Sequence, residues 1–159
     1  MDSESGRTLA TLLRTQRIAA LGTLRQGAPL VSMVLYLPAA DFSAFHLHVS
    51  RLAWHTQDML ADPRVSLSIA ATDDGTRNPQ VLERVSLRGE ATALPNDAPE
   101  HEALKAAWLT RFPDSAIQFE LADFSFFRIE PRDARFVAGF GRIHNLSAAA
   151  LSAAADGSI

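Results

Sequence analysis

A stretch of strict apolar–polar alternation constrains the fold of this chain more than any other feature of its sequence. In residues 84–94, RVSLRGEATAL, apolar side chains such as Val85 and Leu87 alternate with polar ones such as Arg88 and Glu90. A period of two places successive side chains on opposite faces of an extended chain. The stretch therefore predicts a strand in a sheet with one buried side and one side facing solvent.

Further apolar runs predict more strands of the same sheet. IAALGTL and LVSMVLYL are joined by the turn RQGAP, which indicates a hairpin. FHLHVS and RVSLSIAA follow, and two last strands are expected over Phe124–Ile129 and Arg135–Val137, with Pro131 in the turn between them. Strands connected mostly by short turns favour an antiparallel sheet over a doubly wound one.

Three helices are expected to accompany these strands. Leucines at three-to-four spacing predict a helix over Thr8–Arg17, and HEALKAAWLTRF predicts another. A third is expected over Arg51–Ala61, with Ser50 as its N-cap and Asp62-Pro63 at its end. Six or seven strands with three helices fit a small closed or split β-barrel of the α+β class, mainly antiparallel β.

The bulk properties of the chain limit its class and its partners. Its 159 residues suffice for one domain with a real core, and 47% apolar against 21% charged residues indicates a globular protein. A net charge of -3 gives no positive field for nucleic acid. The absence of cysteine excludes disulfides, thiolate metal sites and a cysteine nucleophile. Without a long apolar stretch or a signal-like N-terminus, we expect a soluble cytoplasmic protein with no membrane contact.

The segment HLHVSRLAWHTQDML, which begins at His46, gathers side chains suited to phosphate at the expected strand-to-helix junction. The first turn of a helix presents unpaired N–H groups and the positive end of its dipole, which favour anions. Ser50 and Thr56 can donate hydrogen bonds, Arg51 adds a forked cation, and His55 can donate and carry charge. Two interpretations stay open: a phosphate site, or a Ser50 that only caps the helix beside a solvated Arg51.

Two histidines on the preceding strand raise a rival interpretation. His46 and His48 share one face of that strand, and His55 follows. A His-x-His pair with a third histidine is a known metal arrangement, but no nearby acid completes it here. We therefore predict packed or hydrogen-bonded histidines and no metal site. Gly-rich nucleotide loops and a Gly-x-Ser-x-Gly elbow are absent from the sequence.

Several motifs, taken together, resemble a known family. In order they are RIAALGTLRQGAPLVSMVLY, Ser-x-Leu-Ala-x-His-Thr, DPRVSL, RVSLRGEATAL and GFGR. Over roughly Thr8 to Leu146 the chain resembles the pyridoxamine 5'-phosphate oxidase-like flavoproteins, and most of all the branch related to haem-utilisation proteins. The resemblance implies an FMN-binding split β-barrel with flanking short helices. It also implies a homodimer that holds FMN at its interface.

The resemblance implies roles for individual residues. Ser32, Met33 and Val34 match the strand that runs along the flavin, where backbone groups bond the ring edge and Met33 packs on it. Ser50 matches the strand end near the ribityl phosphate. The expected cofactor-binding residues are therefore Ser32, Met33, Val34, Ser50, His55 and Thr56, with Arg51 added from its charge alone. In the oxidase an Arg-Lys pair stands where this chain has Trp54-His55, which implies a weaker or differently built phosphate site.

Two residues near the C-terminus are candidates for substrate binding. Arg142-Ile143-His144 lies where oxidases of this family hold substrate with an Arg-x-His, so Arg142 and His144 take that role here; no catalytic residue is assigned. The Arg-Leu-x-Pro ending of the oxidases is absent, which argues against vitamin B6 oxidation. Haem-degrading relatives carry a further C-terminal domain, whereas an Ala/Ser tail follows Leu146, which argues against haem degradation.

Together these features predict an FMN-binding protein, a flavin-dependent oxidoreductase that acts on a small molecule. The alternatives are a flavin or haem carrier without turnover, and a metal-dependent barrel; a deazaflavin could replace FMN. The expected organisation is a flexible N-terminus over residues 1–7, the flavin-binding split barrel over 8–146 and a low-complexity tail over 147–159.

Overall fold

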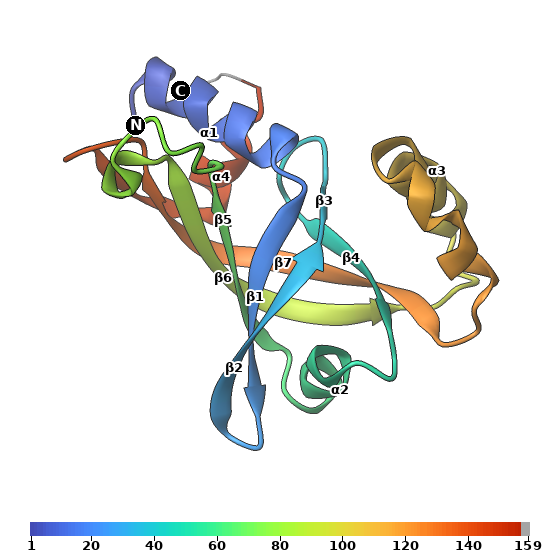
Figure 1. Ribbon diagram of the computed structural model, residues 1–159. Coiled ribbons are helices and arrows are strands. Elements are labelled where there is room, and N and C mark those ends of the chain that lie inside the picture. Colours follow the sequence, from blue (N-terminus) through green and yellow to red (C-terminus); the bar gives the residue numbers. More distant parts are fainter. Residues whose placement is uncertain (157–159) are drawn as a thin grey trace.

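The computed structural model describes residues 1–156 and confirms a mainly antiparallel sheet, curled into a half-barrel (Figure 1). Within these residues eight strands form one sheet in the order β2-β1-β5-β6-β7-β4-β3, and β8 pairs with β7. The strands are β1 (Ile18–Arg25), β2 (Ala28–Leu35), β3 (Leu37–Pro38), β4 (Phe45–Ser50), β5 (Arg64–Ala70), β6 (Arg84–Leu94), β7 (Phe124–Val137) and β8 (Ile143–Ser147).

The sheet buries one side because its strands alternate as the sequence predicts. Along β5 and β6 buried and exposed residues take turns, so that Leu67 and Leu87 face each other on the buried side. This side curls round a core that also receives Leu9 and Leu13 from α1 (Ser3–Thr15). The other side of the sheet carries the small and charged residues of the same strands.

The first helix starts earlier than the leucine spacing predicts. It begins at Ser3 rather than near Thr8, because the Asp2 carboxylate accepts a hydrogen bond from the Ser5 N–H and caps the helix. The segment expected to form a separate N-terminus therefore contains the first turns of α1.

One long strand replaces the two strands and the turn expected near the end of the chain. β7 runs through Pro131, so the prediction of a turn there is wrong. Pro131 is tolerated because it lies opposite Gly89 at a register shift between β6 and β7, where the ladder is already irregular. A Cβ on Gly89 would overlap the carbonyl oxygen of Glu130, so only glycine lets β7 pass this closely.

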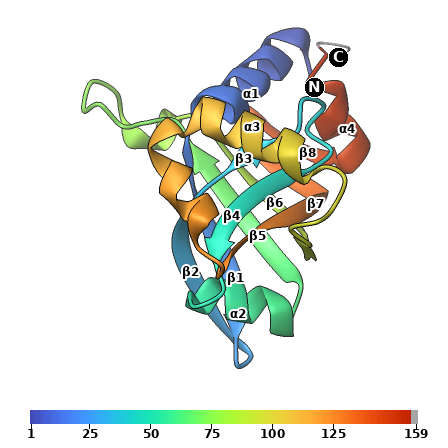
Figure 2. The same ribbon diagram turned by 90° about the vertical axis from the view of Figure 1, so that its right-hand side faces the viewer.

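Short helices flank the sheet. α2 (Trp54–Ala61) packs against one end of β1, and α4 (Ala148–Ala153) packs on β7 and β8. α3 (His101–Arg111) and η2 (Pro113–Glu120) lie over β3 and β4 on the outside of the barrel (Figure 2). The short η1 (Pro79–Val81) precedes β6. Among residues 1–156 no helix has both the length and the apolar character needed to cross a membrane.

Residues 95–123, hereafter the cap, include α3 and η2. A hydrophobic cluster separate from the main core joins the cap to the sheet, and its buried members are Trp108, Phe112 and Phe126. The partly buried residues packed around it are Leu35, Leu37, Leu94, Leu104 and Phe119. The cap therefore covers the outer side of the sheet over β4 and the adjoining ends of β2, β3, β6 and β7, and leaves it open elsewhere.

Candidate functional site

The uncovered part of the sheet presents a surface, hereafter the outer face, that crosses six strands. The register of the strands fixes its cross-strand rows. One row comprises Val31, Gly22, Ser66, Arg88, Asp133 and Ser147, and the next comprises Met33, Ala20, Ser68, Ser86, Arg135 and Asn145. From β2 toward β8, each row passes from apolar through small to charged or polar side chains.

The β2 end of the outer face is apolar and uncovered. Val31 and Met33 are 69% and 68% exposed, and Ile18 on the neighbouring strand is also exposed. Single exposed apolar side chains need no explanation, but a group of them on one surface marks a place where a ligand or another protein binds.

The β7 end of the outer face carries paired arginines. Arg88 donates two hydrogen bonds to Asp133, at 2.8 and 2.7 Å, and Arg132 donates one to Glu90 at 2.6 Å. Solvent screens these exposed pairs, so they contribute little to stability. Their guanidinium groups stay accessible to a carboxylate or phosphate, which the forked geometry suits.

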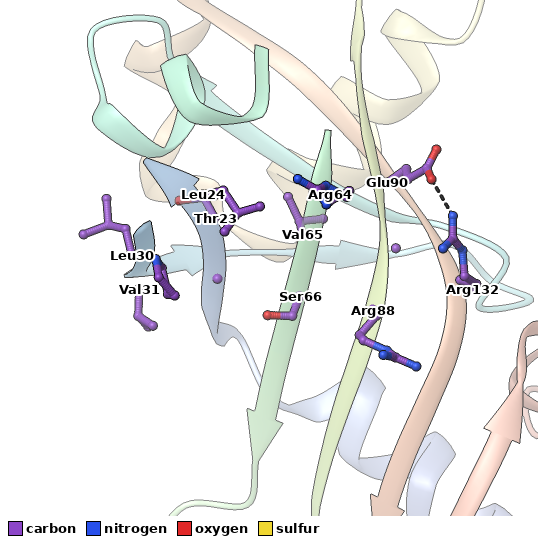
Figure 3. A pocket seen from close by; sticks show the side chains of 13 residues that line it. Thr23, Leu24, Leu30, Val31, Arg64, Val65, Ser66, Arg88, Glu90 and Arg132 are labelled. Carbon is purple, nitrogen blue, oxygen red and sulfur yellow. Dashed lines mark hydrogen bonds and ion pairs between the residues drawn. The ribbon is translucent and has the colours of Figure 1, made fainter. Parts of the chain in front are cut away.

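A recess of about 450 Å³ lies in the outer face where β1, β5 and β6 meet (Figure 3). Gly22 lies in its lining, and a Cβ there would overlap the Ser66 hydroxyl. At the rim, Arg132 reaches across to Glu90 (Figure 3). A second recess of about 630 Å³ adjoins the first and shares Arg88 and Arg132 with it. The two recesses, hereafter the trough, are within the size range of small-molecule sites.

The structure corrects the expected strand-to-helix junction. α2 begins at Trp54 with Ala53 as its N-cap, so the prediction that Ser50 caps this helix is wrong. Ser50 is still paired in the sheet as the last residue of β4, and the chain has to turn before helical geometry begins. The Ser50 hydroxyl donates a hydrogen bond to the Asp123 carboxylate and accepts one from the Leu52 N–H.

Arg51 also contacts the cap. Its N–H donates to the Asp123 carbonyl oxygen at 2.7 Å, and its guanidinium donates to the Ala122 carbonyl oxygen at 3.0 Å. Ser50 and Arg51 therefore fasten the last residues of the cap to the end of β4. The Asp123 carboxylate also places a negative charge beside Ser50, which disfavours an anion there.

His55 and Thr56, the other two residues expected to bind a phosphate, lie on α2. Thr56 is fully buried, and its hydroxyl has no hydrogen-bond partner among residues 1–156. Burial lowers the pKa of His55, and the nearby Asp58 opposes that shift, so His55 brings no charge for a phosphate at neutral pH. Asp58 anchors the helix to β1, because it accepts hydrogen bonds from Thr23 at 3.0 Å and from Arg25 at 2.9 Å.

The residues expected along a flavin lie on β2. Met33 points to the outer face, Val34 is buried in the core and Ser32 is half-buried. β2 ends the strand order, so one of its edges is unpaired among the described residues, with α2 and β4 close by. The free backbone N–H and C=O groups of such an edge can bind a ligand ring. The structure thus brings β2 near α2, whereas Ser50 and Arg51 contact the cap.

Arg142 and His144 lie elsewhere. Arg142 donates to the Ala138 carbonyl oxygen at 3.1 Å and pairs with Glu4 of α1 at 3.6 Å, and Figure 1 shows α1 and α2 at opposite ends of the barrel. His144, on β8, stacks on Phe136 with ring centroids 6.2 Å apart. Neither residue lines the trough, and the structure does not bring them together with the α2 residues.

The three histidines weighed as a metal site are separated. His46 and His48 lie on β4, where His48 contacts the cap, whereas His55 is on α2. Within residues 1–156 no three His, Asp or Glu side chains are grouped as a metal ion requires. The metal-dependent alternative therefore finds no support in this arrangement.

Sequence reasoning missed the outer face, although a signal for it was present. The polar positions of RVSLSIAA and RVSLRGEATAL hold serines near the middle of the face and arginines beyond them. Only the register shows that these positions adjoin the exposed apolar residues of β2.

Comparison with known families decides the relationship. The family model described as CREG, beta-barrel, matches residues 2–152. The chain belongs to the CREG β-barrel family. Among curated proteins, the chain is similar to the Arabidopsis thaliana protein named non-canonical heme oxygenase HOZ, chloroplastic. The two are 37% identical over 136 residues. The match covers 82% of this chain but only 39% of HOZ, so this chain spans about two fifths of the length of that relative.

Solved structures extend the comparison. A heme binding protein from Mycobacterium smegmatis shares 27% identity with a TM-score of 0.82, over 94% of this chain and 60% of that one. A pyridoxamine 5'-phosphate oxidase-like protein from Listeria innocua shares the fold alone, with 13% identity and a TM-score of 0.65 over 84% of this chain and 98% of that one. These findings confirm the predicted split-barrel fold of pyridoxamine 5'-phosphate oxidase-like proteins. The relatives at 37% and 27% identity are named for haem chemistry and haem binding, which is consistent with the haem-related branch that the motifs predict.

Proposed function

We propose that this CREG-family chain binds haem on its outer face. The observation that carries the proposal is the order of side chains along the trough, apolar at the β2 end and arginine-rich at the β7 end. Haem has a flat apolar ring with two carboxylates at one edge, so its shape and charge match that order. The relatives at 37% and 27% identity, which are named for haem chemistry and haem binding, support the ligand class.

The residues present fit the ring and its carboxylates. Leu30 and Val31 line the trough and offer apolar contact, Met33 continues the apolar surface beside them, and Gly22 leaves the surface there without a side chain. Arg88 and Arg132 offer guanidinium groups to the carboxylates. None of the described residues that line the trough is a histidine, so the fit rests on contacts with the ring and the carboxylates, and no iron ligand is assigned. Bound haem would supply redox chemistry at its iron, while these residues hold and orient it.

We also propose that the chain forms a homodimer through the outer face. The exposed group Ile18, Val31 and Met33 lies on a surface that a second copy can cover. In a twofold pairing the same patch of each copy meets its counterpart, so one apolar patch suffices for both. The second copy would close the open side of the trough and exclude water from the ligand.

FMN is the second candidate ligand, favoured by the free edge of β2. That edge lies close to α2, where the buried Thr56 hydroxyl has no partner among the described residues. A flavin or deazaflavin ring edge could bond the strand backbone there, and the chain would then be a flavin-dependent oxidoreductase acting on a small molecule. FMN is the second candidate because the Ser50 hydroxyl already donates a hydrogen bond to Asp123, and because burial lowers the pKa of His55 and keeps it neutral.

Titration of the purified chain separates the two candidates. Haem, FMN and a deazaflavin are added in separate series, and the visible spectrum is recorded. We expect a saturable Soret band with haem and an affinity about tenfold weaker in the double variant Arg88→Ala/Arg132→Ala. Arg77→Ala, which removes an exposed arginine paired with Glu83 outside the trough, is the control and should leave haem affinity unchanged. Saturable flavin binding without haem binding would overturn the haem proposal and favour FMN.

A further inference from the structure

The cap is fastened to the rest of the chain in its middle and at its C-terminal end. Arg111, in the last turn of α3, donates hydrogen bonds to the carbonyl oxygens of Arg14 at 2.7 Å, Tyr36 at 3.1 Å and Gln16. At the C-terminal end the Ser50–Arg51 turn holds the last residues of the cap. The remaining contact of the cap with the sheet is aromatic and centres on a histidine.

His48 occupies the centre of this contact. Its ring stacks on Phe119 of η2, with centroids 4.0 Å apart and planes 12° from parallel. Trp108 and Phe126 lie 5.8 and 4.7 Å from it. His48 is 7% exposed, and its Nδ1 has no hydrogen-bond partner among residues 1–156. A neutral imidazole packs here as an aromatic ring, but a protonated one would be a buried charge without an acidic partner, eased only by a hydrogen bond with Gln118.

The charged surroundings make such a charge worse. His46 lies on the same face of β4, is 8% exposed and also has an Nδ1 without a partner among the described residues. The titratable and charged groups that face the two histidines or the cluster come from several elements. They are His101 and Lys105 from α3, Glu100 just before it, Arg128 from β7, which pairs with Glu130, and Arg17 and Arg111, which lie over the Phe112 ring. The cations Lys105, Arg128, Arg17 and Arg111 outnumber the acids Glu100 and Glu130 that could offset a proton on either imidazole.

We propose that the cap is an acid-sensitive latch, in which protonation of His48, aided by His46, releases α3 and η2 from the sheet while the barrel stays folded. The cap can separate alone because its cluster is distinct from the main core. Arg111 and the Ser50–Arg51 turn then remain as its hinges. This inference concerns the chain without ligand and does not rest on haem binding.

The direction of the pH response follows from the pKa values of the two states. Burial lowers the pKa of His48 to about 4, with His101 lowering it further and Gln118 opposing the shift as a hydrogen-bond partner. Burial is also the main cause that lowers the pKa of His46. In the open cap an exposed imidazole titrates near its ordinary pKa of about 6.5. The open state therefore binds protons first, so the closed cap is fully stable above this value and loses stability as the pH falls toward about 4.

Hydrogen–deuterium exchange of the wild-type chain tests the latch. Between about pH 7.5 and pH 5, protonation of His48 alone should raise the opening constant on the order of 30-fold. After correction for the intrinsic pH dependence of exchange, rates in α3 and η2 should rise by this factor, while those in β5 and β6 stay constant. The chain contains two tryptophans, so Trp54→Phe leaves Trp108 as a reporter, and its emission should shift to longer wavelength over the same range.

Two substitutions separate the latch from general acid sensitivity. His48→Phe keeps a ring on Phe119 but cannot be protonated, so most of the rise in exchange should disappear. His55→Gln removes a histidine on α2 whose pKa is also lowered by burial but which does not belong to the contact between cap and sheet, and it should leave the rise intact. An equal rise in cap and barrel of the wild-type chain, or an unchanged response in a folded His48→Phe variant, would overturn the proposal.

Discussion

Two parts of the same sheet differ in what lies over them. Across β1, β5 and β6 the outer side is open and presents small side chains between apolar residues and paired arginines. Over β4 it is closed by the cap, and His48 packs among aromatic rings. In both parts polar residues occupy the outward positions of their strands. Whether the cap lies over them decides their chemistry. The uncovered arginines stay solvated and available to a ligand, whereas the histidines under the cap stay neutral at neutral pH and take up protons in acid.

Removal of Trp108 is expected to have the largest effect, because it empties the covered region. The indole is fully buried, and its N–H donates to the Ser115 hydroxyl at 2.9 Å. Trp108→Ala should lower the free energy of unfolding by about 3–5 kcal/mol, measured by urea denaturation. Trp54→Ala removes an exposed indole that lies under Arg25 and should cost about 1 kcal/mol or less. Equal losses in the two variants would contradict the contrast between covered and open regions.

The ion pair of Asp58 tests whether a buried charged residue contributes more to the free energy of unfolding than an exposed one. Asp58 is buried and accepts hydrogen bonds from Thr23 and Arg25, which hold α2 on β1. Asp58→Ala leaves both donors without their partner and should destabilise the chain by about 1–3 kcal/mol in urea denaturation. Arg77→Ala, which breaks an exposed pair with Glu83, is the control, and its unfolding midpoint should match that of the wild type.

A smaller effect, on the association of two copies of the chain, is expected at the apolar end of the outer face. If two copies meet there, Met33→Glu places a charge in the contact and should raise the dimer dissociation constant about 10- to 100-fold, measured by sedimentation equilibrium. Ile117→Glu changes an equally uncovered apolar residue on η2 and should leave the constant unchanged. A wild-type chain that sediments as a monomer at every concentration would refute the dimer.

The strands of the sheet could be predicted because alternation reports burial directly. Residues 84–94 form β6, with Val85 and Leu87 buried as expected. The strand through Pro131 could not be predicted in the same way. In isolation this residue signals a turn, and its tolerance depends on Gly89, a residue of another strand.

The candidate site was harder to predict, because its geometry depends on residues far apart in the chain. In the sequence, Ser50 and Arg51 are typical of the start of a helix. In the structure they bond Asp123 at the end of the cap, which the local sequence does not reveal. His48 looks like half of a metal pair until Phe119 stacks on it. Local sequence names the side chains, but tertiary neighbours decide what each of them can bind.

The smallest effect is expected at the exposed pair of Arg88 and Asp133, where stability and binding should separate. The Arg88 guanidinium holds the pKa of Asp133 below its ordinary value, so the pair favours the folded state at neutral pH and loses this effect as acid protonates the carboxylate. Because the pair is solvent-screened, Asp133→Asn should leave the urea midpoint unchanged. It should nevertheless tighten haem binding about two- to threefold, because Arg88 loses a competing carboxylate. If the variant is destabilised while its haem affinity stays constant, Asp133 is a structural residue, and the arginine-rich end of the trough is not where a carboxylate binds.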